Sequence, residues 1–269
     1  MTKPYAEVIG DPITQSKSPI IHRFWLDALE IDADYRRCHV TSDDLAAYFA
    51  ERRRDPDWRG CNITLPHKVA ALDHVEDRGG VRGSIGAINT VLRDGDALIG
   101  TNTDAGGFYA PIAGLELEGA HVVVVGAGGA ARAVLFAVSR LNVGRVTLMN
   151  RSPLKAAALL AMFGLRGDVV PLDAPVPPGA LLVNASALGM TGQPPLDLDL
   201  TALPEDAVVY DIVYSPLETP LLAAARARDL DTVDGLEMLV GQAALAFELF
   251  FGAGPPRDRD DELRSMLTA

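Results

Sequence analysis

Residues 121–134, HVVVVGAGGAARAV, constrain the fold of the chain more than any other stretch. Val122–Val125 are β-branched and apolar with no alternation, which is typical of a strand buried on both faces of a parallel sheet. The pattern G-x-G-x-x-A follows directly at residues 126–131, and an Ala-rich helix is expected from Ala130 to Leu141. The sequence therefore predicts a strand, a glycine-rich turn and a helix in immediate succession.

The glycine-rich turn has the spacing of a dinucleotide-binding motif. Gly126 would allow the tight turn out of the strand, and Gly128 would let the backbone approach a pyrophosphate. Ala131 would let the helix lie close on the sheet, and the free N–H groups at the helix start favour an anion. The strand before the turn and the helix after it are the context that this motif requires, so we predict dinucleotide binding. The alternative is a Gly-rich turn at an ordinary strand–helix junction.

The end of the next strand bears on which dinucleotide fits. That strand is predicted at Arg145–Met149, and NAD enzymes carry an acidic residue near its end, about 20 residues after the glycines, to bind the ribose 2′-OH. This chain has Asn150, Arg151 and Ser152 there, with Lys155 in the following helix. Two cations and no carboxylate fit a 2′-phosphate, so NADP is favoured over NAD. The alternative is that Arg151 is merely an exposed side chain.

Size and charge exclude several classes of protein. The chain has 269 residues and 48% hydrophobic residues, enough for one large domain or two small ones with cores. A formal net charge of -12 without any basic cluster argues against nucleic-acid binding. We expect no signal peptide, because the first residues lack an apolar segment after a basic start, and no membrane-spanning run of about eighteen apolar residues.

The cysteines and histidines do not suggest a metal site. Cys38 and Cys61 lie far apart without metal-ligand spacing, so we expect no disulfide scaffold and a reducing, cytoplasmic location. His67 and His74 are seven residues apart with no acidic or cysteine partner. We interpret both histidines as residues on the surface of a helix and expect no metal.

Short apolar runs alternate with helical segments along the chain. Strands are expected at residues 5–9, 35–40, 60–64, 86–92, 97–100, 180–183, 207–213 and near 232–233. The sequence Asp-Gly-Asp at residues 94–96 predicts a hairpin between two of them. The alternation in the second half predicts a parallel, doubly wound α/β sheet that binds its ligand across the carboxyl ends of the strands.

Polar residues follow the first predicted strand. Ser18 suits the N-cap of a helix expected from Ile20 to Leu29, with Pro19 in its first turn, whereas Ser16 has no capping role. Two hydroxyls on a loop at the carboxyl end of a strand are also suited to binding a polyol. Both interpretations remain open from the residues alone.

The sequence NITLPHK after the third strand carries three polar candidates. Asn62 and Thr64 alternate onto one face of the strand. Pro66 is predicted to start a helix, which puts Lys68 in a first turn where the helix dipole disfavours a cation. Such a lysine usually leans into solvent. A buried one has a lowered pKa and is able to donate a proton near neutrality.

Two further polar residues stand at predicted element ends. Asp104 follows a strand and precedes two glycines, so it is either a turn residue or a catalytic carboxylate on a strand-end loop. Gln242 is the one polar residue in the first turns of an apolar helix expected at Leu239–Phe251. A buried glutamine needs a hydrogen-bond partner, which is either protein or ligand.

These pieces, in this order, resemble the shikimate dehydrogenase family over essentially the whole chain. The matching segments are SKSP from Ser16, NITLPHK from Asn62, GAINT from Gly86, TNTDAGGF from Thr101, GAGGAAR from Gly126, NRS from Asn150, NASALGM from Asn184, DIVYSPLETPLL from Asp211 and DGLEMLVGQAALAFELF from Asp234. The glycine motif occurs in many enzymes, whereas the NITLPHK and TNTD segments together are far more specific. One small departure is Ala187, where the family often has a second hydroxyl residue.

The resemblance implies a substrate domain with a mixed sheet and helices on both faces, formed by residues 1–104 and 238–269, and a Rossmann-like NADP domain formed by residues 105–237. It implies that Lys68 and Asp104 are the catalytic pair. The implied shikimate-binding residues are Ser16, Ser18, Asn62, Thr64, Lys68, Asn89, Asp104, Tyr214 and Gln242. The implied cofactor-binding residues are Gly126, Ala127, Gly128, Gly129, Ala130, Asn150, Arg151, Ser152, Lys155, Ile212, Tyr214, Gly235 and Met238.

The predicted activity is the reversible, NADP-dependent reduction of 3-dehydroshikimate to shikimate, a step in the biosynthesis of aromatic amino acids through chorismate. A close alternative is a quinate/shikimate dehydrogenase that uses NAD, against which Arg151 argues. A more distant alternative is a non-catalytic NADP-binding sensor, against which the intact Lys68 and Asp104 argue. The expected partners are small molecules, and the sequence leaves open whether the chain forms a homodimer.

Overall fold

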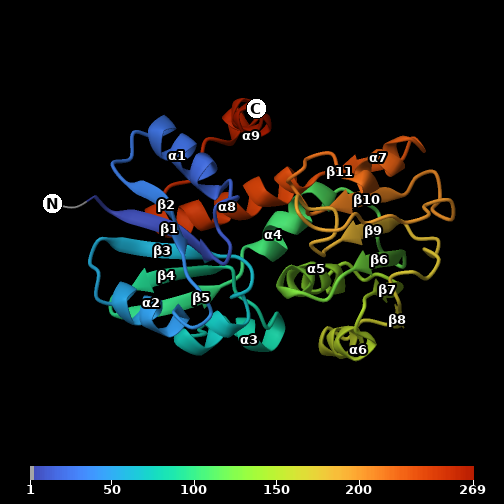
Figure 1. Ribbon diagram of the computed structural model, residues 1–269, viewed down its shortest axis with the longest axis horizontal. Coiled ribbons are helices and arrows are strands. Elements are labelled where there is room, and N and C mark those ends of the chain that lie inside the picture. Colours follow the sequence, from blue (N-terminus) through green and yellow to red (C-terminus); the bar gives the residue numbers. More distant parts are fainter. Residues whose placement is uncertain (1–2) are drawn as a thin grey trace. The chain divides into compact units, whose positions relative to one another are not determined.

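The chain forms two separate sheets, each in its own folding unit, in a computed structural model that describes residues 3–269 (Figure 1). The first unit contains the chain up to Thr103 and from Val240 onward, and the second contains Asp104–Leu239. The helix α8, Gly235–Phe251, therefore begins in the second unit and continues in the first. Both units combine strands with helices, which confirms the predicted α/β class.

The first sheet is mixed. Its strands are β1 (Tyr5–Gly10), β2 (Asp34–His39), β3 (Trp58–Ile63), β4 (Thr90–Asp94) and β5 (Ala97–Thr101), in the order β2-β1-β3-β4-β5. β1 pairs in parallel with β2 and β3, whereas β4 is antiparallel to both β3 and β5. The predicted hairpin between β4 and β5 is confirmed, and Gly95 has the positive φ of 60° that its tight turn needs.

Helices cover both faces of the first sheet. They are α1 (Ser18–Ala28), α2 (Leu45–Arg52), α3 (Val81–Ser84), α9 (Asp260–Thr268) and the 3₁₀-helices η1 (Ala70–His74) and η3 (Arg257–Arg259). In Figure 1, α1 and α9 lie on one side of this sheet and α2 on the other. The ring of Phe250 on α8 comes so close to Gly60 that a Cβ there would lie 2.5 Å from it, so α8 packs directly on β3.

The second sheet is fully parallel. Its strands are β6 (His121–Val125), β7 (Arg145–Met149), β8 (Gly167–Val170), β9 (Leu181–Asn184), β10 (Val208–Asp211) and β11 (Asp231–Val233). The order β11-β10-β9-β6-β7-β8 is the doubly wound arrangement, with its switch point between β6 and β9. The sequence patterns did not predict β8, which is a partly exposed edge strand.

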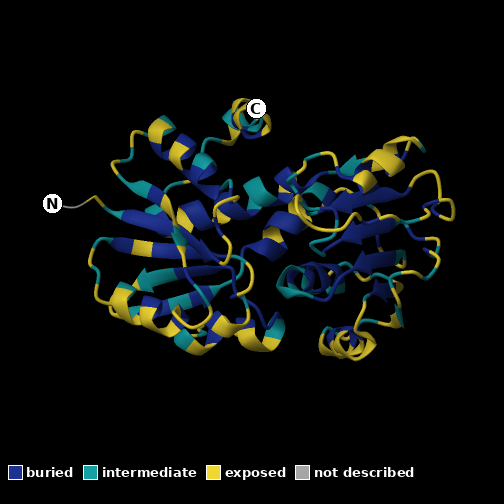
Figure 2. Ribbon diagram, viewed as in Figure 1, coloured by how far each residue is buried: buried dark blue, intermediate teal, exposed yellow. Residues whose placement is uncertain are grey.

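The second sheet is buried on both faces, as Val122–Val125 predicted (Figure 2). Val122 and Val124 belong to a core formed with α4 (Asp104–Tyr109), α5 (Gly129–Ser139) and α6 (Pro153–Met162). Val123 and Val125 belong to a second core formed with α7 (Pro220–Arg226) and the long connection before β10. The 3₁₀-helix η2 (Ala110–Ile112) completes this unit. A strand of this kind fixes the position of the turn that follows it.

Candidate active site

The predicted substrate residues of the first unit lie along one edge of its sheet. β3 and β5 run parallel to β1, and β4 runs the other way, so the ends of β1, β3 and β5 and the start of β4 share an edge. The residues that the sequence places at this edge are Ser16, Ser18, Asn62, Thr64, Lys68 and Asn89. Topology thus gathers polar groups from three separate segments into one region of the unit.

Ser16 places its hydroxyl at the start of α1. The helix α1 begins at Ser18, two residues before its predicted start, and Lys17 is its N-cap residue without a side-chain cap. Ser16 Oγ accepts a hydrogen bond of 3.4 Å from the Ser18 backbone N–H. Arg37 holds the same loop by donating to the Ser16 carbonyl at 2.9 Å. The Ser18 hydroxyl is buried but does not cap α1, so the predicted cap was wrong.

Three amide side chains belong to one buried hydrogen-bond network. Asn62 Nδ2 donates to Thr90 Oγ1 at 3.1 Å, and Asn89 Nδ2 donates to Thr103 Oγ1 at 2.8 Å and to Gln242 Oε1 at 3.2 Å. All five side chains are buried. The network therefore brings Asn62 and Asn89 of the sheet edge together with Gln242 of α8. Sequence reasoning did not single out Thr90 and Thr103, although the GAINT and TNTD segments contain them.

Lys68 lies in a turn and not in a helix. Residues 65–69 form turns, and only the short η1 follows them. The Lys68 carbonyl accepts a 2.8 Å hydrogen bond from the Ile88 N–H. It therefore bonds to a neighbouring loop and not to an N–H group of a helix. The predicted helix start at Pro66 was wrong, and the dipole argument against a cation at this position no longer applies. The Lys68 side chain is half-buried.

His67 is a buried structural residue, so the prediction of a helix-surface position was wrong. Only 1% of its surface is exposed, and its Nε2 lies 2.7 Å from the Val40 carbonyl oxygen.

Within residues 3–269, no cluster of three His, Cys, Asp or Glu side chains has the arrangement to hold a metal ion. In the same described range, no helix is long and apolar enough to cross a membrane.

Asp104 is the first residue of α4 and is buried, with 4% exposure. The residue before it is fixed by Asn89, because the Thr103 N–H donates to Asn89 Oδ1 at 2.7 Å and the Thr103 hydroxyl accepts from Asn89 Nδ2. The backbone that leads into Asp104 is therefore anchored to a predicted substrate residue. Asp104 thus lies where a strand-end loop passes into a helix, and its catalytic role stays a prediction.

The glycine-rich turn of the second unit has the shape that a pyrophosphate needs. Gly126 has a φ of 107°, and a Cβ at this position would lie 2.9 Å from the Ala185 carbonyl oxygen, so only glycine fits where the loops after β6 and β9 meet. Gly128 is the N-cap of α5, and a Cβ there would meet nothing within 4 Å. Ala131 is fully buried against the sheet. Open backbone at the start of a helix fits a phosphate group.

The loop after β7 fits a 2′-phosphate. Asn150 Nδ2 donates to the Ser152 carbonyl at 3.0 Å, and Ser152 is the N-cap residue of α6. The side chains of Arg151 and Lys155 are exposed on either side of this cap, and the segment carries no carboxylate. Two cations beside a helix start attract a dianionic phosphate and leave a ribose 2′-OH without its usual acidic acceptor.

Asp211 ties together the two loops that follow β9 and β10. Its carboxylate accepts hydrogen bonds from Asn184 Nδ2 at 2.9 Å, from the Val213 N–H at 3.0 Å and from Thr219 Oγ1 at 2.7 Å. Burial raises the pKa of Asp211 to about 6, although these three hydrogen bonds act to lower it. The carboxylate thereby fixes the segment that contains Ile212 and Tyr214.

Gly235, at the start of α8, lies against this segment. A Cβ on Gly235 would come within 2.5 Å of the carbonyl oxygens of Ile212 and Val213, so the backbone approaches too closely for any other residue. Met238, one turn later in α8, is buried in the core that includes Tyr210. The predicted nicotinamide-side residues of the second unit therefore cluster around the end of β10.

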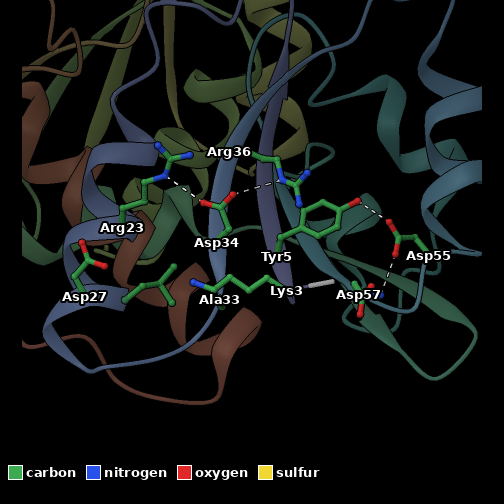
Figure 3. Close-up of a pocket in the computed structure, with 10 residues that line it drawn as sticks. Lys3, Tyr5, Arg23, Asp27, Ala33, Asp34, Arg36, Asp55 and Asp57 are labelled. Atoms are coloured by element: carbon green, nitrogen blue, oxygen red, sulfur yellow. Dashed lines mark hydrogen bonds and ion pairs between the residues drawn. The ribbon is translucent and has the colours of Figure 1, made fainter. Parts of the chain in front are cut away.

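A pocket of about 610 Å³ lies at the opposite edge of the first sheet (Figure 3). It surrounds the starts of β1 and β2, and the residues that line it include none of those predicted for the site. Several of its polar groups are paired with one another: the Tyr5 hydroxyl donates to Asp55 at 2.7 Å, and Arg23 lies 3.3 Å from Asp34. Arg36 stacks over the Tyr5 ring at 3.5 Å. We interpret this pocket as a satisfied surface network.

Known proteins match the chain along its length. The model of the shikimate dehydrogenase substrate binding domain matches residues 8–91, and that of the shikimate 5′-dehydrogenase C-terminal domain matches residues 235–260. The chain is 71% identical over 267 residues to a shikimate dehydrogenase (NADP(+)) of Sphingopyxis alaskensis. The match covers 99% of this chain and 97% of the relative. The chain belongs to the shikimate dehydrogenase family. The resemblance inferred from the motifs is confirmed.

Solved structures of the shikimate dehydrogenase family share the fold. The enzyme of Thermus thermophilus, solved in complex with NADP(H) and shikimate, has 38% identity and a TM-score of 0.85, with 98% of this chain and 99% of that chain covered. A quinate dehydrogenase from Corynebacterium glutamicum in complex with NAD has 30% identity and the same TM-score of 0.85, with the same coverage of both chains. The same architecture therefore accommodates either cofactor, and the residues of the individual chain must determine which one it binds.

Proposed function

We propose that this chain is an NADP-dependent shikimate dehydrogenase that interconverts 3-dehydroshikimate and shikimate. The observation that carries the proposal is the 71% identity, over 99% of the chain, to a relative of that name. The edge of the first sheet supports a polyhydroxylated acid as substrate, because it gathers hydroxyl and amide groups from three segments. Two cations without a carboxylate after β7 support NADP.

In this proposal the first unit binds the substrate and the second unit binds the cofactor. Residues 1–104 and 238–269 form the substrate domain, and residues 105–237 form the cofactor domain. The substrate-binding groups are Ser16, Ser18, Asn62, Thr64, Lys68, Asn89, Asp104, Tyr214 and Gln242. The NADP-binding groups are residues 126–130 of the glycine turn, Asn150, Arg151, Ser152 and Lys155 for the adenosine phosphate, and Ile212, Tyr214, Gly235 and Met238 for the nicotinamide side.

Lys68 and Asp104 are the catalytic pair. Bound NADP supplies the redox chemistry by accepting or donating a hydride. When shikimate is oxidised, Lys68 Nζ accepts the proton that the 3-hydroxyl releases, and in the reducing direction it returns that proton to the carbonyl oxygen. Asp104 accepts a hydrogen bond from a substrate hydroxyl and so orients that hydroxyl. The buried Asp104 is held by its anchored backbone and needs little rearrangement for this role.

The direct test is the absorbance of reduced nicotinamide with shikimate and with quinate, each with NADP and with NAD. We expect efficient turnover of shikimate with NADP and much weaker turnover in the other three combinations. A strong preference for NAD would support the quinate/shikimate alternative, which the Corynebacterium glutamicum relative makes worth testing. Binding of NADP without turnover of either substrate would support a non-catalytic sensor.

Replacing Arg151 by alanine should raise KM for NADP at least tenfold and leave KM for NAD nearly unchanged. A hydrogen bond to a charged group contributes about 1.5–3 kcal/mol, which corresponds to about tenfold to hundredfold in affinity. Arg145→Ala is the matched control, because Arg145 is an exposed arginine at the other end of β7, paired with Asp168. It should change neither KM. Equal effects of Arg151→Ala on both cofactors would argue against recognition of the 2′-phosphate.

The remaining predictions concern location and partners. Cys38 and Cys61 are free thiols on β2 and β3, which β1 separates, and this supports a reducing cytoplasmic location. Shikimate, 3-dehydroshikimate and NADP are the proposed partners. We expect no nucleic-acid or membrane partner. Size-exclusion chromatography measures whether the chain forms a homodimer.

A further inference from the structure

Tyr35 is a buried tyrosine on β2 that belongs to none of the sequence motifs. It has no exposed surface, and its hydroxyl lies 2.6 Å from Asn62 Oδ1. Its ring stacks on the His22 imidazole, with 3.8 Å between centroids and 2° between planes, and the Phe250 ring lies 6.5 Å away. Side chains of α1 and α8 therefore fix the direction in which the hydroxyl points.

The contacts of Asn62 define the orientation of its amide. Its Nδ2 lies 3.4 Å from the Asn89 backbone carbonyl oxygen and 3.1 Å from Thr90 Oγ1. A carbonyl oxygen only accepts hydrogen bonds, so the amide must present its NH₂ group on that side. The Oδ1 atom must then face Tyr35, and the phenol must donate. Tyr35 thus donates to Asn62, and Asn62 in turn donates to Thr90.

The network continues from Asn62 through Thr90 to Asn89. Thr90 Oγ1 accepts from Asn62 Nδ2, and it lies 3.1 Å from Asn89 Oδ1 and 3.3 Å from Thr103 Oγ1. The orientation of Asn89 is fixed by backbone, because its Oδ1 accepts from the Thr103 N–H, and its NH₂ group donates to Gln242 Oε1. Asn62 is therefore the member of the network that Tyr35 contacts directly.

We propose that Tyr35 is a positioning residue for the substrate, because its hydroxyl helps to hold the Asn62 amide in its binding orientation. The inference rests on the proposed function, in which Asn62 contacts the substrate. Without the phenol hydroxyl, Asn62 Oδ1 loses its donor, and the amide is held only through Nδ2, by the Asn89 carbonyl and Thr90 Oγ1.

The test compares Tyr35→Phe with Tyr48→Phe. Tyr48 is also a buried tyrosine, on α2, and its hydroxyl donates at 2.8 Å to Glu7 Oε1, whose residue pairs in register with Cys61 and not with Asn62. Each variant removes one buried hydroxyl and keeps its ring. Tyr35→Phe should raise KM for shikimate about tenfold, change kcat less than about threefold and leave KM for NADP unchanged, in line with the loss of one buried hydrogen bond. Tyr48→Phe should lower stability without changing any of the three constants.

A double-mutant cycle with Asn62→Ala separates positioning from general loosening. If Tyr35 acts through Asn62, Tyr35→Phe should add nothing to KM for shikimate once Asn62 is alanine. Equal KM effects of the two tyrosine variants, a wild-type KM in Tyr35→Phe or a fully additive cycle would each overturn the inference. Equilibrium dialysis with shikimate and NADP gives the same comparison without turnover. Failure of the wild-type protein to turn over shikimate would instead contradict the proposed function.

Discussion

Replacing Lys68 by alanine is expected to lower kcat for shikimate oxidation about 10²-fold or more, with little change in KM. A positioned general acid or base contributes about 10²–10⁴-fold to a rate, and the loss falls on the chemical step because the proton moves only there. Lys68 is suited to this role because its turn is tied by a backbone hydrogen bond to Ile88, one residue before the proposed substrate residue Asn89. Initial rates at saturating NADP measure the effect.

Lys68→Arg distinguishes proton transfer from simple charge. Arginine keeps the positive charge but does not release a proton in the working pH range, so this variant should stay as slow as the alanine variant. Lys3→Met is the control, because Lys3 pairs with the exposed Asp32 at 2.7 Å and lies at the opposite end of β1. It should keep kcat. Recovery of kcat in Lys68→Arg would reduce Lys68 to an electrostatic role, and a normal kcat in Lys68→Ala would remove it from the chemistry.

The second unit was predictable from its sequence because local rules decide its structure. Val122–Val125 read as a strand buried on both faces, and the two cores on either side of β6 confirm this. Gly126 occupies a conformation that other residues rarely adopt, so the pattern alone locates the turn. β8 escaped prediction because an edge strand of four residues, half of them exposed, has neither alternation nor a continuous apolar run.

The turn at Lys68 was not predictable because distant segments decide it. Pro66 is a good first residue for a helix, yet the Leu65 carbonyl accepts from the Asp11 N–H at 3.0 Å. His67 is buried because its imidazole bonds to the Val40 carbonyl. These partners come from the loops after β1 and β2, and the residue spacing around Lys68 does not indicate them. Tertiary hydrogen bonds overrode the local preference for a helix.

In the candidate site, the sequence indicated which residues take part but not how they are arranged. The motifs contained Asn62, Asn89 and Gln242, and their residue types indicated hydrogen bonding. They did not indicate that Asn62 is linked to Asn89 through Thr90, or that Asn89 donates directly to Gln242. Direction in a hydrogen-bond network depends on which neighbour only accepts or only donates, and that information exists only in the folded chain.

A shift from about pH 8 to about pH 5 is expected to weaken the folding of the first unit by about 2 kcal/mol through His22 alone. His22 has no exposed surface, and within residues 3–269 neither ring nitrogen has a hydrogen-bond partner. Its neighbours are the rings of Tyr35, Trp25, Phe247 and Phe250. Burial among these rings lowers the pKa of His22 to about 3, from an ordinary value of 6.5.

The sign follows from proton binding. Between about pH 6.5 and about pH 3 the unfolded chain binds a proton at His22 that the folded chain does not, so stability is complete above the unfolded pKa and falls as the pH drops. Asp211 acts in the opposite sense, because its folded pKa of about 6 is raised, and its contribution to stability is lost as the pH rises. Asp211 lies in the second unit, and all variants keep it.

Urea titrations followed by tryptophan fluorescence measure this effect, because both tryptophans, Trp25 and Trp58, are buried in the first unit. His22→Phe and His22→Gln should each remove the acid loss of about 2 kcal/mol, whatever they do to stability at about pH 8. Two His22 variants with the wild-type acid slope would show that the imidazole is protonated inside the fold, and the dry aromatic environment inferred for α1 and α8 would then be wrong.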